Sequence, residues 1–567
     1  MVPSSRILLV FASLVLAGNT MVQAQDVEEV IDAPIFGLTG SLAARSSLYQ
    51  ATGIEDRRTP LSWTVSGSLT PTFKSRSVPM SFVVSERERT FRQPFNVVGL
   101  SPRYKWASLH LGYRSLDFSR YTLAGRQFFG AGLELKPGAF RLGAMYGRFQ
   151  RAVMEDSAAD YIVPAYEQSG MGLELGVETG GVKVMVSWVR AKDDTGSLPP
   201  QGEVSELTPQ ENNALGLDLA LTLIPNHLTL DVEGGASLFT RDLDSPDLDL
   251  EESDIPAFLK NIQPLKLSTT LTFAARTGLN LTFANWGVRF GYERIEPEYQ
   301  SLGAYYFNTD VENYTVAPHI STGGLRLAGS IGLGRDNVLD QKLARTTRII
   351  GSLNADWQPS QTFGLSGAFT NYSTGQSAGR QAINDTIAVR SVTQGGSLSP
   401  RLFFSGESVN HALSLVGGYQ DFTDLNAFTR EFSDNSTLTG SLSYNLTLLK
   451  SRLSIGTGFT VSRTELPSVR SDLLGVNANA GMTFLNDDAL SLNLSAGATR
   501  STTSGSVDQV STVLSENATI GFRPSRHDNL TLSGDGMQSS SGGGVDGLES
   551  FTEYSVTLGY SRTFSLN

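Results

Sequence analysis

The chain has 567 residues, a net charge of −12, 57 glycines and no cysteine, and only 18% of its residues are charged. The lack of cysteine excludes disulfides, thiolate metal sites and lipidation on cysteine. The negative charge disfavours nucleic acid as a partner. Abundant glycine and few charges favour many strands and turns over helices.

The first residues predict a cleaved secretory signal peptide. Arg6 precedes an apolar run of 12 residues, 7–18, and a small-residue cleavage site follows at 22–24. A membrane-spanning helix needs about 18 apolar residues, so this run is too short to cross a membrane. We therefore predict a signal peptide over residues 1–24. Its removal takes away Arg6 and no acidic residue, so the mature chain begins at Gln25 with a net charge of −13.

Four segments before residue 127 alternate apolar and polar side chains in the way of β-strands. They are residues 35–50, 60–73, 77–87 and 104–114. A local excess of basic residues overlaps them, within a chain that is acidic overall. Its first members are Arg87, Arg89, Arg92, Arg103, Lys105, Arg114, Arg120 and Arg126, and Arg141, Arg148 and Arg151 continue it.

Two interpretations of this basic run are open. Arginines that project into a barrel lumen could line a constriction that prefers anions, since charged rings set selectivity. Alternatively, the run forms a structural network that holds an inward segment, paired with Glu86, Glu88, Asp117 and Glu134.

From residue 127 onward, short turns alternate with longer polar connections. The turns lie near residues 136–138, 179–181, 225–226, 285–286, 321–324, 359–360, 405–407, 449–451, 486–488 and 524–526. The segments between them are long enough, at about ten residues, to cross a bilayer as tilted strands. Trp286 and Trp357 lie at such turns, where membrane barrels carry interface aromatics.

The last strand, EYSVTLGYSRTFSLN at 553–567, shows the alternation most clearly, with Leu558 on an apolar face and Thr557 on a polar one. An alternating strand that closes on an aromatic residue resembles the assembly signal that barrel-insertion machinery recognises. Tyr560 and Phe564 are the candidate residues of this signal, and Phe564 stands three residues from the end.

These elements predict an all-β fold, a single transmembrane antiparallel up-and-down β-barrel of about 24–26 strands. We expect residues 25–34 to be a short periplasmic segment and residues 35–567 to be the barrel. The ten turns give twenty strands, and the upstream segments and the last strand bring the sum to twenty-five. Single-chain bacterial barrels have an even number, so one segment before residue 127 should be wrong. Residues 35–48 are the weakest and could instead lie inside the lumen.

Several stretches resemble a known family. They are SPRYKWASLHLGYRSLDFSRYTLAGRQFFGAGLELKPGAFRLGAMYGRFQRA at 101–152, PAYEQSGMGLELGV from Pro164, VRAKDD ending at Asp194, PQENN from Pro209 and SLGAYYFNTDVENYTV from Ser301. Over residues 33–320 the chain resembles large, poorly characterised outer-membrane β-barrel proteins of the Bacteroidetes and their relatives. The resemblance implies a fold and a location in the bacterial outer membrane, and no activity.

The sequence offers no catalytic or cofactor motif. The histidines His110, His227, His319, His411 and His527 are too dispersed for adjacent metal ligands, and there is no GxSxG elbow. The acidic run 241–254 lacks the glycine and spacing of an EF-hand loop. We expect no enzyme activity, no cofactor and no metal site.

The leading functional hypothesis is a porin-like channel that passes small polar solutes or ions. The alternative is a non-transporting outer-membrane scaffold, or a component of an envelope assembly or secretion complex. The expected partners are outer-membrane lipid, the barrel-assembly machinery during biogenesis, and an envelope protein in the scaffold case.

Overall fold

The computed structural model describes residues 36–74, 76–86, 97–154, 164–198, 207–249, 255–305, 308–380, 384, 388–485, 488–505, 508–542 and 550–566. The predicted signal peptide and the segment 25–34 lie outside these residues. No helix within the described ranges is long and apolar enough to cross a membrane.

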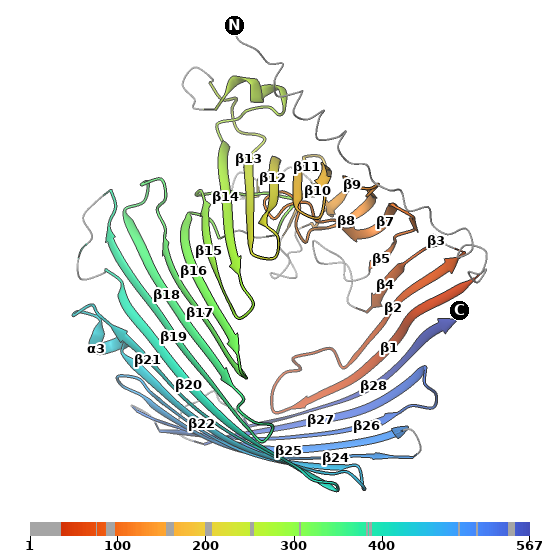
Figure 1. Ribbon diagram of the computed structural model, residues 1–567, viewed down its shortest axis with the longest axis vertical. Coiled ribbons are helices and arrows are strands. Elements are labelled where there is room, and N and C mark those ends of the chain that lie inside the picture. Colours follow the sequence, from red (N-terminus) through yellow and green to blue (C-terminus); the bar gives the residue numbers. More distant parts are fainter. Residues whose placement is uncertain are drawn as a thin grey trace.

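Within the described ranges, 26 antiparallel strands pair in sequence order and close into one barrel (Figure 1). The first thirteen are β1 (Gly37–Thr52), β2 (Leu61–Phe73), β4 (Met80–Ser85), β5 (Val97–Leu100), β7 (Ala107–Ser115), β8 (Gln127–Leu135), β9 (Phe140–Gln150), β10 (Glu167–Glu178), β11 (Val182–Asp194), β12 (Glu211–Ile224), β13 (Leu228–Thr240), β14 (Thr269–Thr282) and β15 (Trp286–Ile295). The others are β16 (Val311–Thr322), β17 (Leu325–Arg335), β18 (Ala344–Trp357), β19 (Phe363–Ala378), β20 (Arg390–Ser405), β21 (Val409–Asp424), β22 (Asn435–Leu448), β23 (Leu453–Glu465), β24 (Arg470–Phe484), β25 (Leu490–Ser504), β26 (Gln509–Phe522), β27 (Asp528–Gly542) and β28 (Phe551–Leu566).

Short elements complete the described structure: the two-residue strands β3 (Arg76–Ser77) and β6 (Arg103–Tyr104), the 3-10 helix η1 (Ala257–Asn261) and the single helical turn α3 (Arg430–Ser433). The strands β3 and β6 pair with each other, and they also pair with β2 and β7, respectively. They lie in the connections around β4 and β5 and are not counted among the strands of the barrel wall.

The barrel closes between its first and last strands. Leu38 pairs with Leu566 at one end and Thr52 pairs with Thr552 at the other, and Figure 1 shows β28 beside β1. The short turns lie at the end of the barrel that holds Leu38 and Leu566, which we call the turn end. The longer connections lie at the opposite end, which we call the loop end.

The predicted strand range is confirmed, and one expectation about it is wrong. Each of the four segments before residue 127 contributes a strand, so none had to be discarded. In particular, residues 37–52 form β1 in the wall and do not lie inside the lumen. The missing strand is β5, whose four residues are too short to show alternation. The ten predicted turns all fall at junctions between consecutive strands from β8 to β27, although Trp286, Ser321, Thr322 and Ser405 belong to strand ends and Asn486 and Asp487 lie outside the described residues.

The wall has two chemically different faces. Neighbours in register on one face are apolar, as in the row Met482, Leu492, Ile520, Leu532 and Leu558. The adjacent row on the opposite face is Gly481, Asn493, Thr519, Ser533 and Thr557. Following the register around the barrel keeps apolar residues on the first face, and the opposite face is polar except on β8 to β13, where it carries buried apolar residues such as Phe128, Met145 and Val189. We assign the apolar face to the outside and the polar face to the lumen, as in membrane-spanning barrels.

One carboxylate departs from this pattern near the middle of a strand. Glu516 on β26 shares the outer face with its register partners Ala496 and Gly536, and its side chain is exposed. A Cβ built on Gly536 would lie 2.6 Å from Glu516 Oε1, so the side chain lies over that glycine.

Candidate functional site

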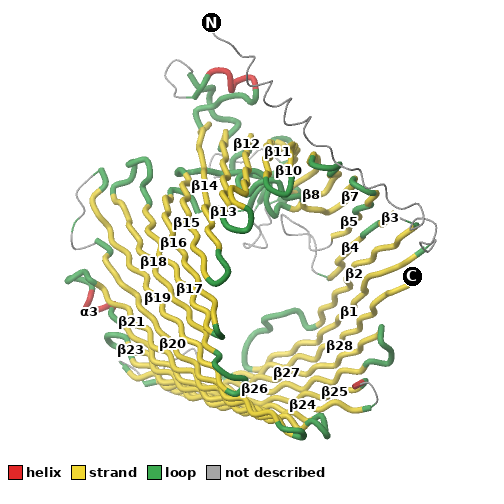
Figure 2. The backbone as a smooth tube through the Cα atoms, viewed as in Figure 1, coloured by secondary structure: helices red, strands yellow, loops and turns green. Residues whose placement is uncertain are grey.

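A connecting segment folds onto the lumen face of the wall. Residues 116–126, between β7 and β8, bury Phe118, Tyr121, Thr122 and Leu123 against strands β9 to β13. Figure 2 shows loop segments gathered beside β10 to β12. Burial raises the pKa of the Tyr121 phenol above its ordinary value, so this side chain stays neutral.

Glycines on the lumen face make room for this segment. A Cβ on Gly143 or Gly172 would lie 2.7 or 2.9 Å from the ring of Phe118. A Cβ on Gly216 would lie 2.8 Å from Thr122 Cγ2, and one on Gly235 would lie 2.5 Å from Tyr121 Cβ. Each distance is below van der Waals contact, so these positions must be glycine for the segment to dock this closely.

The connection between β15 and β16 is hydrogen-bonded to the connection between β7 and β8. In residues 296–305, the first described part of the connection between β15 and β16, Tyr299 donates to the Tyr121 carbonyl at 2.7 Å. Ser301 donates to the Thr122 carbonyl, and the Ala124 amide donates to the Gly303 carbonyl at 3.1 Å. The two connections therefore form one packed unit on the lumen side of β8 to β16, which we call the inward loops.

Charged groups surround the tip of the first inward loop. Arg120 pairs with Glu233 on β13 at 2.9 Å and approaches Glu293 on β15 at 3.9 Å. Arg276 on β14 is the register partner of both glutamates. Arg289 joins Arg120, Arg276 and Glu293 in lining a cavity of about 510 Å³. The tip is thus held by ion pairs as well as by apolar packing.

A second, more polar cavity lies at the loop end beside the inward loops. Its volume is about 590 Å³, and its lining includes Arg126, Gln168, Asp193, Arg241 and Glu298. We call it the loop-end cavity. Arg126 donates to Gln168 Oε1 at 3.2 Å, and Gln168 donates to Asp193 Oδ1 at 2.8 Å. Gln168 and Asp193 are buried, with exposed fractions of 4% and 6%.

The far side of the lumen has a different lining. From β22 to β27 the described lumen-facing residues are serine, threonine, asparagine and glycine, with few others. Among them Asp535 is the single charged residue, and it accepts hydrogen bonds from Asn517 at 2.7 Å and Ser555 at 3.3 Å. The lumen face of these six strands is therefore hydrophilic and almost uncharged.

The structure does not gather the predicted basic residues in one place. Arg87, Arg89 and Arg92 lie outside the described residues. Arg103 and Lys105 lie in the connection between β5 and β7 at the turn end, where Lys105 lies over the Tyr104 ring at 5.5 Å. Arg114, Arg120 and Arg126 lie on the lumen side.

Each lumen-side arginine has its own contacts. Arg114 donates to Ser81 Oγ at 2.7 Å, and the Arg126 guanidinium lies 5.7 Å from the Phe149 ring and 5.4 Å from the Tyr305 ring. Of the acidic residues first considered as partners, Glu88 lies outside the described residues and the other three make other contacts. Glu86 accepts from the Trp63 amide, Asp117 accepts from the Gly125 amide, and Glu134 binds His110 and Lys136.

The candidate assembly residues lie on the closing strand. Tyr560 is partly exposed on the outer face and donates to Asp528 at 2.7 Å. Phe564 pairs with Gly40 of β1 near the turn end, and the Arg562 guanidinium lies 5.7 Å from its ring.

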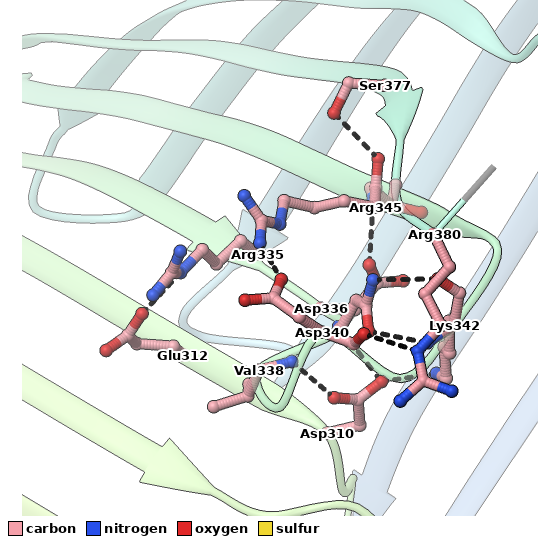
Figure 3. Close-up of polar contacts among 12 residues, drawn as sticks. Asp310, Glu312, Arg335, Asp336, Val338, Asp340, Lys342, Arg345, Ser377 and Arg380 are labelled. Atoms are coloured by element: carbon pink, nitrogen blue, oxygen red, sulfur yellow. Dashed lines mark hydrogen bonds and ion pairs between the residues drawn. The ribbon is translucent and has the colours of Figure 1, made fainter. Parts of the chain in front are cut away.

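A separate polar cluster ties the connections together at the loop end (Figure 3). Asp310, just before β16, accepts from the amides of Val338 at 2.8 Å and Asn337 at 3.0 Å, and it pairs with Lys342. Burial raises the pKa of Asp310, but Lys342 and the two amides lower it further, so it ends below its ordinary value. Within the described residues, no group of histidine, aspartate or glutamate could hold a metal ion.

The docking of the inward loops on the lumen face was not predicted from the sequence, although the sequence of β10 contains one indication of it. Gly170, Gly172 and Gly176 recur at even positions of β10, so that much of its lumen face lacks side chains. Such a bare face allows another part of the chain to approach closely.

No protein-family model and no curated protein matches the chain. Solved structures with a similar fold include the P pilus usher PapC translocation pore, with 13% identity, a TM-score of 0.34 and coverage of 93% of this chain and 100% of that one. The FrpB iron transporter from Neisseria meningitidis has 10% identity, a TM-score of 0.39 and coverage of 93% and 81%. OccAB4 from Acinetobacter baumannii has 10% identity, a TM-score of 0.27 and coverage of 94% and 99%. At these scores the likeness carries no argument about function.

Proposed function

We propose that the protein is an outer-membrane channel through which small polar solutes or ions pass along the lumen. The observation that carries the proposal is the two-faced wall of the closed ring, apolar outside and polar inside except where β8 to β13 pack against the inward loops. Barrels of 16 to 18 strands already enclose an aqueous channel, and this barrel has more strands than they do. The proposal assigns no catalytic activity to the chain.

The outer-membrane location rests on three features. Residues 1–24 have the features of a secretory signal, the outer face is apolar, and Trp286 and Trp357 are exposed at the turn end. We also propose that the chain is related to the large Bacteroidetes barrels that residues 33–320 resemble. Tyr560 and Phe564 on β28 would then be recognised by the barrel-assembly machinery.

Planar-bilayer conductance tests the proposal. Purified protein should give stable ion conductance, and deletion of residues 118–124 should increase it, because the first inward loop occupies part of the lumen. A shorter control deletion within residues 466–469, the connection between β23 and β24 at the loop end, should leave the conductance unchanged. Absence of conductance in both the intact protein and the 118–124 deletion would contradict a channel and favour the scaffold.

A further inference from the structure

We propose that the loop-end cavity binds a small neutral polyhydroxylated solute, a mono- or disaccharide, before it enters the lumen. This inference rests on the proposed channel function and names the class of solute. The cavity volume of about 590 Å³ lies within the usual range of small-molecule sites.

The charges of the cavity lining balance one another. Arg126 and Asp193 are joined through Gln168, which accepts from the arginine and donates to the aspartate. Arg241 and Glu298 form an ion pair at 3.2 Å. The lining thus contains two cationic and two anionic side chains, and its net charge is zero. A bound ion would therefore find no excess of opposite charge in the cavity.

The remaining polar groups of the cavity suit hydroxyl groups. Four glutamines line it, Gln150, Gln168, Gln210 and Gln300, of which Gln168 contacts Arg126 and Asp193 and Gln150 donates to the Tyr166 carbonyl at 2.9 Å. An amide both donates and accepts hydrogen bonds, as does a sugar hydroxyl, so the two groups are complementary without any ionic contact. Tyr166 and Tyr305 also line the cavity and supply ring faces for the apolar face of a sugar.

The wall beyond the cavity is an independent observation that favours the same class of solute. The lumen face from β22 to β27 offers hydroxyl and amide groups, and Asp535 is its single charged residue in the described part. Charged rings are what makes a barrel select ions, and these six strands contribute almost no charge to such a ring. A neutral solute that exchanges water for hydroxyl and amide partners would pass along it without an electrostatic barrier.

Equilibrium dialysis of the purified protein with radiolabelled glucose and maltose tests the proposal. We expect saturable binding that weakens at least tenfold in Gln168→Leu and in Tyr305→Ala. Tyr305 is exposed, so its variant should fold even if Gln168→Leu does not. The control is Gln509→Leu, which makes the same change on the lumen face of β26 and should bind the sugars as the unchanged protein does.

Two kinds of result would overturn the inference. One is a lack of saturable binding of both sugars, or an equal loss of binding in the cavity variants and in Gln509→Leu. The other is tighter binding of gluconate or glucosamine than of glucose, which would show that the site selects a charge. Parallel conductance measurements separate the failures: conductance without sugar binding defeats this inference alone, whereas absent conductance defeats the proposed function on which it rests.

Discussion

Replacement of Gly235 by valine should release the inward loops from the wall. Gly235 lies on the lumen face of β13, where an added Cβ would lie 2.5 Å from Tyr121 Cβ and would also meet the Tyr299 hydroxyl. Because both tyrosines are buried, the loops cannot give way without leaving their packed positions. Overpacking of this kind costs about 1–3 kcal/mol, which corresponds to a shift of roughly 5- to 150-fold in the docking equilibrium.

The neighbouring glycine provides a matched control. Gly234 lies on the outer face, and a Cβ there would have its nearest neighbour, the Ala274 carbonyl oxygen, at 3.9 Å. Gly234→Val therefore makes the same chemical change in the same strand without touching the inward loops. It also adds an apolar side chain to the lipid-facing surface, which the membrane tolerates.

Trypsin and conductance together measure the effect. Arg120 lies within the first inward loop and is held by Glu233, so cleavage after Arg120 should be slow in the unchanged protein and in Gly234→Val. In Gly235→Val cleavage should be at least fivefold faster, and conductance should be larger. Equal cleavage rates in the two variants would refute the reasoning, because they would show that the glycine is not needed for docking.

Three further predictions concern the barrel wall and its loop end. Leu558→Arg should lower the amount of assembled barrel far more than Ser555→Arg on the same strand, since a lipid-facing arginine costs about 2–4 kcal/mol at the midplane; equal amounts would mean that the faces are reversed. Glu516→Leu should raise stability against denaturant by up to about 2 kcal/mol, because it removes a carboxylate from the apolar face, and unchanged stability would place Glu516 in water. Asp310 has a lowered pKa in the folded state, so its stabilisation is complete above its ordinary pKa and disappears as pH falls through the lowered value. Thermal unfolding of Asp310→Asn should thus show a deficit of about 1–3 kcal/mol near neutral pH that vanishes in acid, and a deficit independent of pH would exclude the Lys342 ion pair as its cause.

The strands were largely predictable from sequence because their signal is local. In a barrel wall each residue faces either lipid or lumen, so alternation and turn residues mark the strands directly. The strand β5 was not predicted because its four residues, Val97–Leu100, are too few for an alternating pattern to be distinguished from a loop.

The inward loops could not be predicted for a different reason. Their docking depends on a contact between Tyr121 and Tyr299, which are 178 positions apart in the chain. Nothing local distinguishes residues 116–126 from a connection that stays outside the lumen. The basic residues show the same limit: Arg120 finds its partner on β13, and no spacing rule relates it to Glu233.

The pairing of β1 with β28 sets a condition on the order in which this wall can form. Thr557 donates to Ser47 across the closing seam, 510 positions away in sequence. Because a chain is synthesised from its N-terminus, one edge of β1 must stay unpaired until the last strand is present. Unpaired edges recruit other strands, and such distant pairings form slowly. A chain that stops before β28 would present two open edges, at β1 and β27, and should aggregate before it could close as a smaller barrel.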